Sequence, residues 1–116
     1  MRVLLVEDDP DLREVMQLAL EEHGYVVEPA AGLKEAQAFL AAVPYRLVIT
    51  DWRLPDGDGT LLALWATQLD AKAIVVSGFL RDMPGGWAEE HPTLMKPFRL
   101  NQLLEAVREA IGEAVG

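Results

Sequence analysis

Short apolar runs separated by stretches with helical spacing constrain the fold of this chain more than any other sequence feature. Five runs of apolar, mostly β-branched residues recur along it, at residues 3–6, 25–27, 47–49, 73–76 and 94–95. Runs this short and this apolar are typical of strands that are buried on both faces of a sheet. The runs therefore predict five buried strands.

The stretches between these runs carry helix signals. Asp9 suits an N-cap, Pro10 suits the first position of a helix, and Gly24 marks its end. Further helices are predicted over residues 33–43, 60–68 and 100–111. In the third of these four helices, Leu61, Leu64 and Trp65 share one side, and we expect that side to face the core.

Strands that alternate with helices predict an α/β fold, a doubly wound five-stranded parallel sheet with helices on both faces and right-handed crossovers. Ligands of such sheets bind at the carboxyl ends of the strands. The second strand delivers only Glu28 and Pro29 there, which offer no evident chemistry. We therefore place this strand at an edge, in the order 2-1-3-4-5.

Length and composition exclude several classes of protein. With 116 residues, 51% of them hydrophobic, the chain predicts one folded domain over residues 1–116 rather than a disordered segment. No unbroken apolar run exceeds six residues, so we expect neither a transmembrane helix nor a signal peptide. Cysteine is absent, which excludes disulfides and thiolate metal sites and fits a cytoplasmic protein.

The charge balance bears on partners. Lys and Arg number 10 against 19 Asp and Glu, which gives a formal net charge of −9. This negative field repels nucleic-acid backbones and anionic lipids, so we expect no direct binding to nucleic acid or membrane. The same field attracts cations.

Polar side chains at the ends of four of the predicted strands suggest where a cation binds. The first strand is followed by Glu7 and Asp8, and the third by Asp51. Three carboxylates this close together are unfavourable unless a cation lies among them or one is protonated. Hard oxygen ligands with few protein donors favour Mg²⁺. Ser77 and Lys96 follow the fourth and fifth strands, where a hydroxyl and an ammonium suit a phosphoryl group carried on a carboxylate.

Each of these features also has an ordinary structural explanation. An acidic pair after a strand usually begins a helix, and Asp51 before a Pro- and Gly-rich segment is usually a turn former. Ser77 followed by glycine is by itself a loop, and Lys96 by itself is a surface charge. Their joint position at four strand ends favours a common site.

These residues and their spacing resemble the receiver domain of two-component response regulators, the family of the chemotaxis receiver protein. The resemblance covers nearly the whole chain and rests on Leu4-Leu5-Val6-Glu7-Asp8-Asp9, Val48-Ile49-Thr50-Asp51, Leu54-Pro55-Asp56-Gly57-Asp58-Gly59, Val75-Val76-Ser77-Gly78 and Lys96-Pro97-Phe98. It implies a flavodoxin-like fold and a role as phosphoacceptor in a phosphorelay. Mg²⁺ would be its cofactor.

The resemblance also assigns roles to single residues. It implies that Asp51 is the phosphoacceptor, and that Asp8 and Asp51 bind Mg²⁺ directly. Glu7 would bind the ion through water, and Arg53 would bind it through its backbone carbonyl. Lys96 would pair with the phosphoryl group, and its peptide bond to Pro97 is expected to be cis. Ser77 is similar to the hydroxyl that moves to the phosphoryl oxygen when the family switches.

Some positions depart from the family pattern. Thr93 stands where the switch partner of Ser77 is usually an aromatic residue, and Gly78 stands where alanine usually follows the hydroxyl. Residues 79–92 contain Pro84, Gly85 and Gly86, which oppose a helix. We therefore expect the fourth helix of the family to be shortened or irregular here, with at most a turn or two around residues 87–90.

We thus expect a domain that takes a phosphoryl group from a histidine kinase or phosphotransfer domain and switches a protein partner downstream. No DNA-binding domain is expected after the last helix, and a stand-alone receiver and a part of a larger or hybrid protein both stay open. An alternative is a receiver fold that works as an interaction module without phosphorylation. An enzyme acting on small molecules is disfavoured, because Arg53 occupies the position where such enzymes need a second carboxylate.

Overall fold

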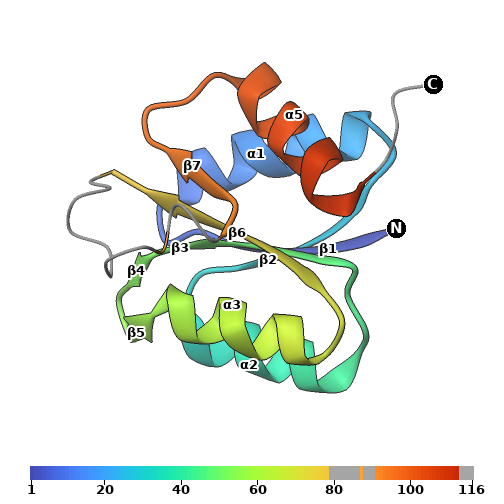
Figure 1. Cartoon of the computed structure of the whole chain (residues 1–116). Helices are drawn as coiled ribbons and strands as arrows, with labels where there is room; N and C mark the ends of the chain where they lie inside the picture. The colour runs from blue at the N-terminus through green and yellow to red at the C-terminus, as the bar shows by residue number, and fades with distance from the viewer. Residues whose placement is uncertain (79–86, 88–90, 113–116) are drawn as a thin grey trace.

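Five parallel strands form the single large sheet of the computed structural model, which describes residues 1–78, 87 and 91–112 (Figure 1). The strands lie in the order β2-β1-β3-β6-β7, which confirms the predicted order. A short antiparallel hairpin, β4 with β5, follows β3 and was not predicted. The strands are β1 (Arg2–Val6), β2 (Val26–Ala30), β3 (Leu47–Asp51), β4 (Arg53–Leu54), β5 (Gly57–Asp58), β6 (Lys72–Ser77) and β7 (Thr93–Met95).

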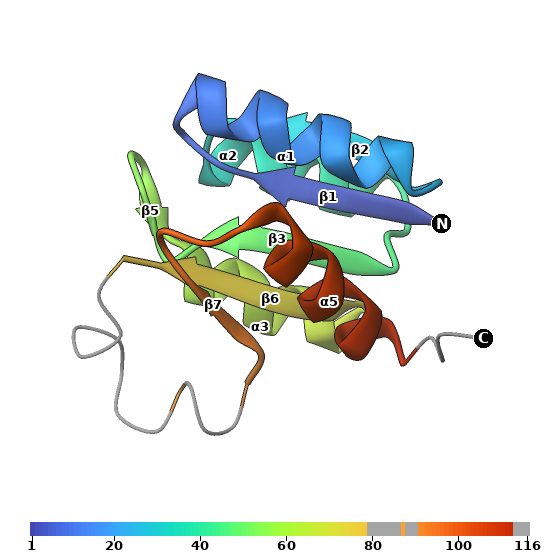
Figure 2. The ribbon, with the colours of Figure 1, turned by 90° about the horizontal axis from the view of Figure 1, so that it is seen from above.

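Helices cover both faces of the sheet. In Figures 1 and 2, α1 and α5 lie on one face and α2 and α3 on the other. Each face has its own apolar core, one around Leu5, Leu20 and Leu103 and one around Leu4 and Leu62. The doubly wound fold is therefore confirmed. The helices are α1 (Pro10–Glu22), α2 (Leu33–Ala42), α3 (Gly59–Gln68) and α5 (Leu100–Ile111).

Side-chain caps fix the starts of the helices that follow the acidic loops. Asp9 accepts hydrogen bonds from the backbone N–H groups of Asp11 and Leu12 at 3.0 and 3.3 Å, and Pro10 is the first residue of α1, as predicted. Asp58 caps α3 in the same way, through the N–H of Thr60 at 2.8 Å. These caps place the loops before α1 and α3 at the carboxyl edge of the sheet.

Two expectations about the elements were wrong. Of the predicted inner side of α3, Trp65 packs against the core, but Leu61 and Leu64 are 60% and 43% exposed, whereas Leu62 and Ala66 are buried. This helix is apolar nearly all round, so the spacing of its leucines did not reveal its inner face. The second strand does not end before Glu28 but continues through Pro29, which an edge strand tolerates because the missing N–H can face outward.

Most of the segment expected to be irregular, residues 79–86 and 88–90, lies outside the described residues. Of its described members, His91 donates its backbone N–H to the Trp87 carbonyl at 2.9 Å, the spacing of one helical turn. The peptide bond between Lys96 and Pro97 is cis, as expected. Within the described ranges, no helix has both the length and the apolar character that crossing a membrane requires.

Candidate functional site

The carboxyl ends of four neighbouring strands bring the predicted site residues to one edge of the sheet. A pocket of about 300 Å³ opens there, beside Asp51 at the end of β3. Because β1, β3, β6 and β7 are parallel and adjacent, the residues that follow them converge on this pocket. It is lined by Asp8, Asp51, Trp52, Arg53, Val76, Ser77, Gly78 and Lys96.

Three carboxylates and one ammonium form the charged centre of this acceptor pocket. Glu7, Asp8 and Asp51 each offer an oxygen within 4.8 Å of the others. Glu7 and Asp51 are only 1% and 4% exposed, whereas Asp8 is exposed to solvent. The Lys96 Nζ lies 2.9 Å from Glu7 Oε1 and 3.0 Å from Asp51 Oδ1, so one cation bridges the two buried carboxylates.

The electrostatics of this centre favour additional positive charge. Burial raises the pKa of Asp51, and the hydrogen bond and negative charge of Glu7 raise it further, to about 8, although Lys96 opposes the shift. Burial lowers the pKa of Lys96, but its contacts with Glu7 and Asp51 outweigh that effect and leave it above the usual value. A single ammonium therefore does not offset the two buried carboxylates.

The residues present fit a magnesium ion. Asp51 Oδ2 is buried and receives no hydrogen bond, while Oδ1 is paired with Lys96. An unpaired buried carboxylate oxygen is costly unless a cation or a proton meets it. The donor set consists of carboxylate oxygens, with no histidine or cysteine among the pocket residues, and this is the ligand chemistry of Mg²⁺ rather than of zinc.

Backbone contacts hold the loop that carries Asp51. Trp52 donates its N–H to the Val76 carbonyl at 2.8 Å, which continues the ladder between β3 and β6 past Asp51. Gly59 donates its N–H to the Trp52 carbonyl at 2.6 Å, and a Cβ at Gly59 would overlap the Asp51 carbonyl oxygen. Only glycine permits this close approach. These contacts fix the backbone from which the Asp51 side chain extends.

The structure separates the predicted residues into two groups. Asp8, Asp51, Arg53, Ser77 and Lys96 line the acceptor pocket, and Glu7 is joined to them through its ion pair with Lys96. Thr93 does not line the pocket. It begins β7 opposite Val75, and its hydroxyl donates to the His91 carbonyl at 3.2 Å.

The predicted site residues leave out two contributors to the site. Trp52 lines the pocket, and the Arg53 guanidinium carbon lies 4.7 Å from the centre of the Trp52 ring, a cation–π contact. Arg13 of α1 donates from Nη1 to the Glu7 carbonyl at 2.7 Å. The adjacency of Trp52 and Arg53 was a usable signal, whereas nothing in the sequence indicated where Arg13 reaches.

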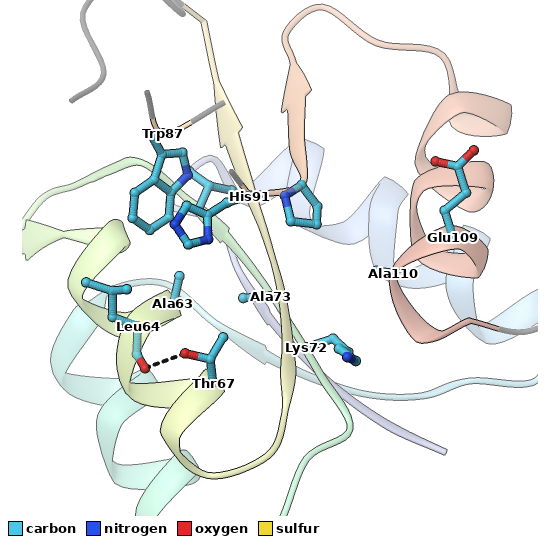
Figure 3. A pocket seen from close by; sticks show the side chains of 11 residues that line it. Ala63, Leu64, Thr67, Lys72, Ala73, Trp87, His91, Glu109 and Ala110 are labelled. Carbon is cyan, nitrogen blue, oxygen red and sulfur yellow. Dashed lines mark hydrogen bonds between the residues drawn. The ribbon is translucent and has the colours of Figure 1, made fainter. Parts of the chain in front are cut away.

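A second cavity, of about 250 Å³, lies between α3 and β6, with two residues of α5 in its lining (Figure 3). The rings of Trp87 and His91 stack at one side of it, with centroids 3.9 Å apart. Trp52, which lines the acceptor pocket, packs against the small apolar cluster of Ala63, Val75 and Trp87, and these three residues line the second cavity. No carboxylate cluster like that of the acceptor pocket lines it, among the residues that the structure describes.

Comparisons with known proteins agree with this geometry. The family model of the response regulator receiver domain matches residues 3–108. The transcriptional regulatory protein PmrA of Pectobacterium parmentieri is 37% identical over 96% of the chain, and the chain spans about half of PmrA (52%). The response regulator receiver protein CpdR of Brucella abortus is 33% identical, over 95% of the chain and 96% of CpdR.

A solved structure shows the same arrangement of elements. The response regulator TrrA of Thermotoga maritima, in complex with Mg²⁺-BeF, is 30% identical and superimposes with a TM-score of 0.80 over 94% of this chain and 97% of that one. The match of the family model extends from β1 into α5 and so includes every strand that contributes to the acceptor pocket. The chain therefore belongs to the response regulator receiver domains, the phosphoacceptor modules of two-component signal transduction.

Proposed function

We propose that Asp51 is the residue of this receiver domain that accepts a phosphoryl group, from a histidine kinase or from a phosphotransfer domain. The observation that carries the proposal is the asymmetry of the Asp51 carboxylate. Oδ1 is held by Lys96 at 3.0 Å, whereas Oδ2 is buried without a hydrogen-bond donor. Lys96 thus orients the carboxylate through one oxygen, and the other is left without a protein donor, as suits a carboxylate that binds a cation and acts as a nucleophile.

In the proposed reaction, an oxygen of the Asp51 carboxylate attacks the phosphorus atom of the donor. The new P–O bond forms as the P–N bond of a phosphohistidine breaks, and the bonding electrons leave with the imidazole. Lys96 orients the carboxylate through Oδ1 and favours its ionised form. Its ammonium is then close enough to pair with an oxygen of the transferred group. Ser77 lines the same pocket and would contact that group through its hydroxyl.

A bound Mg²⁺ would offset the negative charge of the carboxylates and of the phosphoryl oxygens. Asp8 and Asp51 would hold the ion directly, the Arg53 carbonyl would be a third protein ligand, and Glu7 would act through water. The Glu7, Asp8 and Asp51 oxygens, all within 4.8 Å of one another, support this set.

The proposed output is a change of contacts with a protein partner. Ser77 and Thr93 are the proposed switch pair, one lining the acceptor pocket and one at the start of β7, opposite Val75. The net charge of −9 disfavours direct binding of this domain to DNA. We place this activity in the cytoplasm, which the absence of cysteine supports.

The test is incubation of the chain with acetyl phosphate and Mg²⁺, followed by intact mass. We expect one added phosphoryl group in wild type and none in Asp51→Asn. Asp56→Asn is the matched control, because Asp56 lies in the same loop but is exposed and bonds to α2. It should retain the adduct.

An adduct that persists in Asp51→Asn would show that another residue is the acceptor. Wild-type protein that takes no adduct, from acetyl phosphate or from a phosphorylated phosphotransfer domain, would favour the interaction module that works without phosphorylation.

A further inference from the structure

We propose that Arg13 is a positioning residue for Mg²⁺, which holds the loop that carries Asp8. The inference rests on the proposed function of the acceptor pocket and goes beyond it, because Arg13 does not line that pocket. Arg13 lies in the second turn of α1, and its Nη1 donates to the Glu7 carbonyl at 2.7 Å. A guanidinium bond of this length to a partly buried carbonyl is charge-assisted and stronger than a neutral hydrogen bond.

The Glu7 carbonyl lies where the ladder of the sheet stops. Glu7 donates its N–H to the Ala30 carbonyl at 3.0 Å, just beyond the last paired residues of β1 and β2. Ala30 ends β2, so the regular pairing of these strands does not extend to the Glu7 carbonyl. Arg13 supplies a donor to this carbonyl from the neighbouring helix.

Arg13 therefore bonds to the residues on both sides of Asp8. Its backbone N–H donates to the Asp9 carbonyl at 2.9 Å, and its side chain reaches back to Glu7. The N–H of Asp9 in turn donates to Glu7 Oε2 at 3.1 Å. Asp8 lies between these two tethered residues. Its carboxylate is exposed, so the direction in which it points depends on the backbone that Arg13 holds.

Positioning and charge predict opposite effects of removing this arginine. A cation near a metal site repels Mg²⁺, so loss of the charge alone strengthens metal binding. Loss of the tether lets Asp8 move away from Asp51, which weakens metal binding. Residues that orient metal ligands typically contribute tenfold or more to metal affinity. A variant that binds Mg²⁺ more weakly would therefore identify Arg13 as a positioning residue, and one that binds Mg²⁺ more tightly would show that only its charge matters.

The experiment compares Arg13→Met and Arg13→Gln with Arg46→Met in the full chain. Both Arg13 variants lose the charge, but Gln keeps an N–H donor, and Arg46 is an exposed arginine whose backbone pairs at the start of β3. Mg²⁺ is titrated against tryptophan fluorescence, since Trp52 lines the pocket. We expect the Kd for Mg²⁺ to rise about tenfold in Arg13→Met, less in Arg13→Gln, and not in Arg46→Met.

Two further readouts separate positioning from a general loss of structure. In metal-free protein, the amide of Asp9 should exchange hydrogen faster in Arg13→Met than in wild type, while amides of β3 stay unchanged. At saturating Mg²⁺, acetyl phosphate should still phosphorylate Arg13→Met to the wild-type extent, so the defect is confined to the Mg²⁺ concentration required.

A Kd in Arg13→Met that is unchanged or lower than in wild type would overturn this inference and leave the proposed function intact. Wild-type protein that neither binds Mg²⁺ nor accepts a phosphoryl group would instead overturn the proposed function. The two failures are therefore distinguishable.

Discussion

Asp51 ends β3, Asp56 lies five residues later in the β4–β5 turn, and their environments are opposite. Asp51 is buried beside Glu7, and its pKa is raised to about 8. Asp56 is exposed, and its two oxygens accept the backbone N–H groups of Leu33 and Lys34 at 2.7 and 2.9 Å. These hydrogen bonds hold the pKa of Asp56 below its usual value. Of these two nearby carboxylates, one therefore has a buried oxygen without a donor, and the other has a backbone donor on each oxygen.

The difference shows that the donors around a carboxylate, not the residue type, determine its role. Asp9 and Asp58 resemble Asp56, since each caps a helix, whereas Glu7 belongs with Asp51 in the acceptor pocket. Carboxylates of the first kind stabilise the scaffold whether or not a ligand is present. Those of the second kind destabilise the metal-free fold and are stabilised by cations.

Removal of Lys96 should give the largest effect, because it leaves Glu7 and Asp51 without their shared cation. We expect Lys96→Met to lower the free energy of unfolding by about 3 kcal/mol at pH 8 in the presence of a chelator. This value is at the low end for a buried pair, since the Lys96 side chain is 31% exposed. Urea denaturation measures the change.

The matched control for that variant is Lys72→Met, which removes the same charge from an exposed position at the start of β6. Its effect should be small. Equal losses of stability in the two variants would mean that net charge matters, rather than the ion pairs with Glu7 and Asp51.

The pH dependence of stability tests the raised pKa of Asp51. A carboxyl whose pKa is higher in the folded state than the unfolded value of 3.8 binds its proton more tightly when folded, so its contribution is lost as the pH rises toward about 8. Asp51→Asn cannot lose a proton. In chelator, the stability of the variant relative to wild type should therefore increase with pH, by up to about 1.4 kcal/mol per pH unit.

Saturating Mg²⁺ should remove the pH dependence of this stability difference between Asp51→Asn and wild type. A metal-bound Asp51 stays ionised as the pH rises toward about 8. Parallel stability curves for wild type and Asp51→Asn in chelator would show that Asp51 titrates normally and that the contrast with Asp56 is weaker than the structure indicates.

Much of the fold was predictable, because local signals and tertiary packing agree. The apolar runs identified all five strands of the large sheet, and the cap at Asp9 with Pro10 identified the start of α1. The prediction failed where tertiary packing determines the extent of a strand or the inner face of a helix. Pro29 continues β2 because that strand is at an edge, and the inner face of α3 depends on what the helix meets rather than on its leucine spacing.

The composition of the site was also predictable, since strand ends of a parallel sheet converge on one edge. The opposite pKa directions of Asp51 and Asp56 were not, because they depend on the burial of one carboxylate and on the amides of α2 beside the other. The tether from Arg13 to Glu7 was missed for the same reason. A long side chain that bonds a backbone carbonyl six residues earlier leaves no pattern in the sequence.

Loss of the Asp56 side chain should give the smallest effect on stability. It tests the carboxylate whose two oxygens both accept backbone hydrogen bonds. Gly32, the residue before α2, has no side chain with which to cap the helix, so Asp56 caps it from the β4–β5 turn. Asp56→Ala should lower Tm by roughly 3 to 6 °C at pH 7, as the loss of a helix cap does in a domain of this size. Asp56→Asn should lower it less, because an amide oxygen still accepts one hydrogen bond.

This effect should have the opposite pH dependence to that of Asp51. Because the pKa of Asp56 is lowered, its contribution is present above the unfolded value of 3.8 and is lost as the pH falls through the lower folded value. The gap in Tm between wild type and Asp56→Ala should therefore close in acid, while Glu105→Ala, an exposed carboxylate of α5, should show no such gap. A gap that persists unchanged after Asp56 is protonated would mean that the neutral carboxyl caps α2 as well as the carboxylate does.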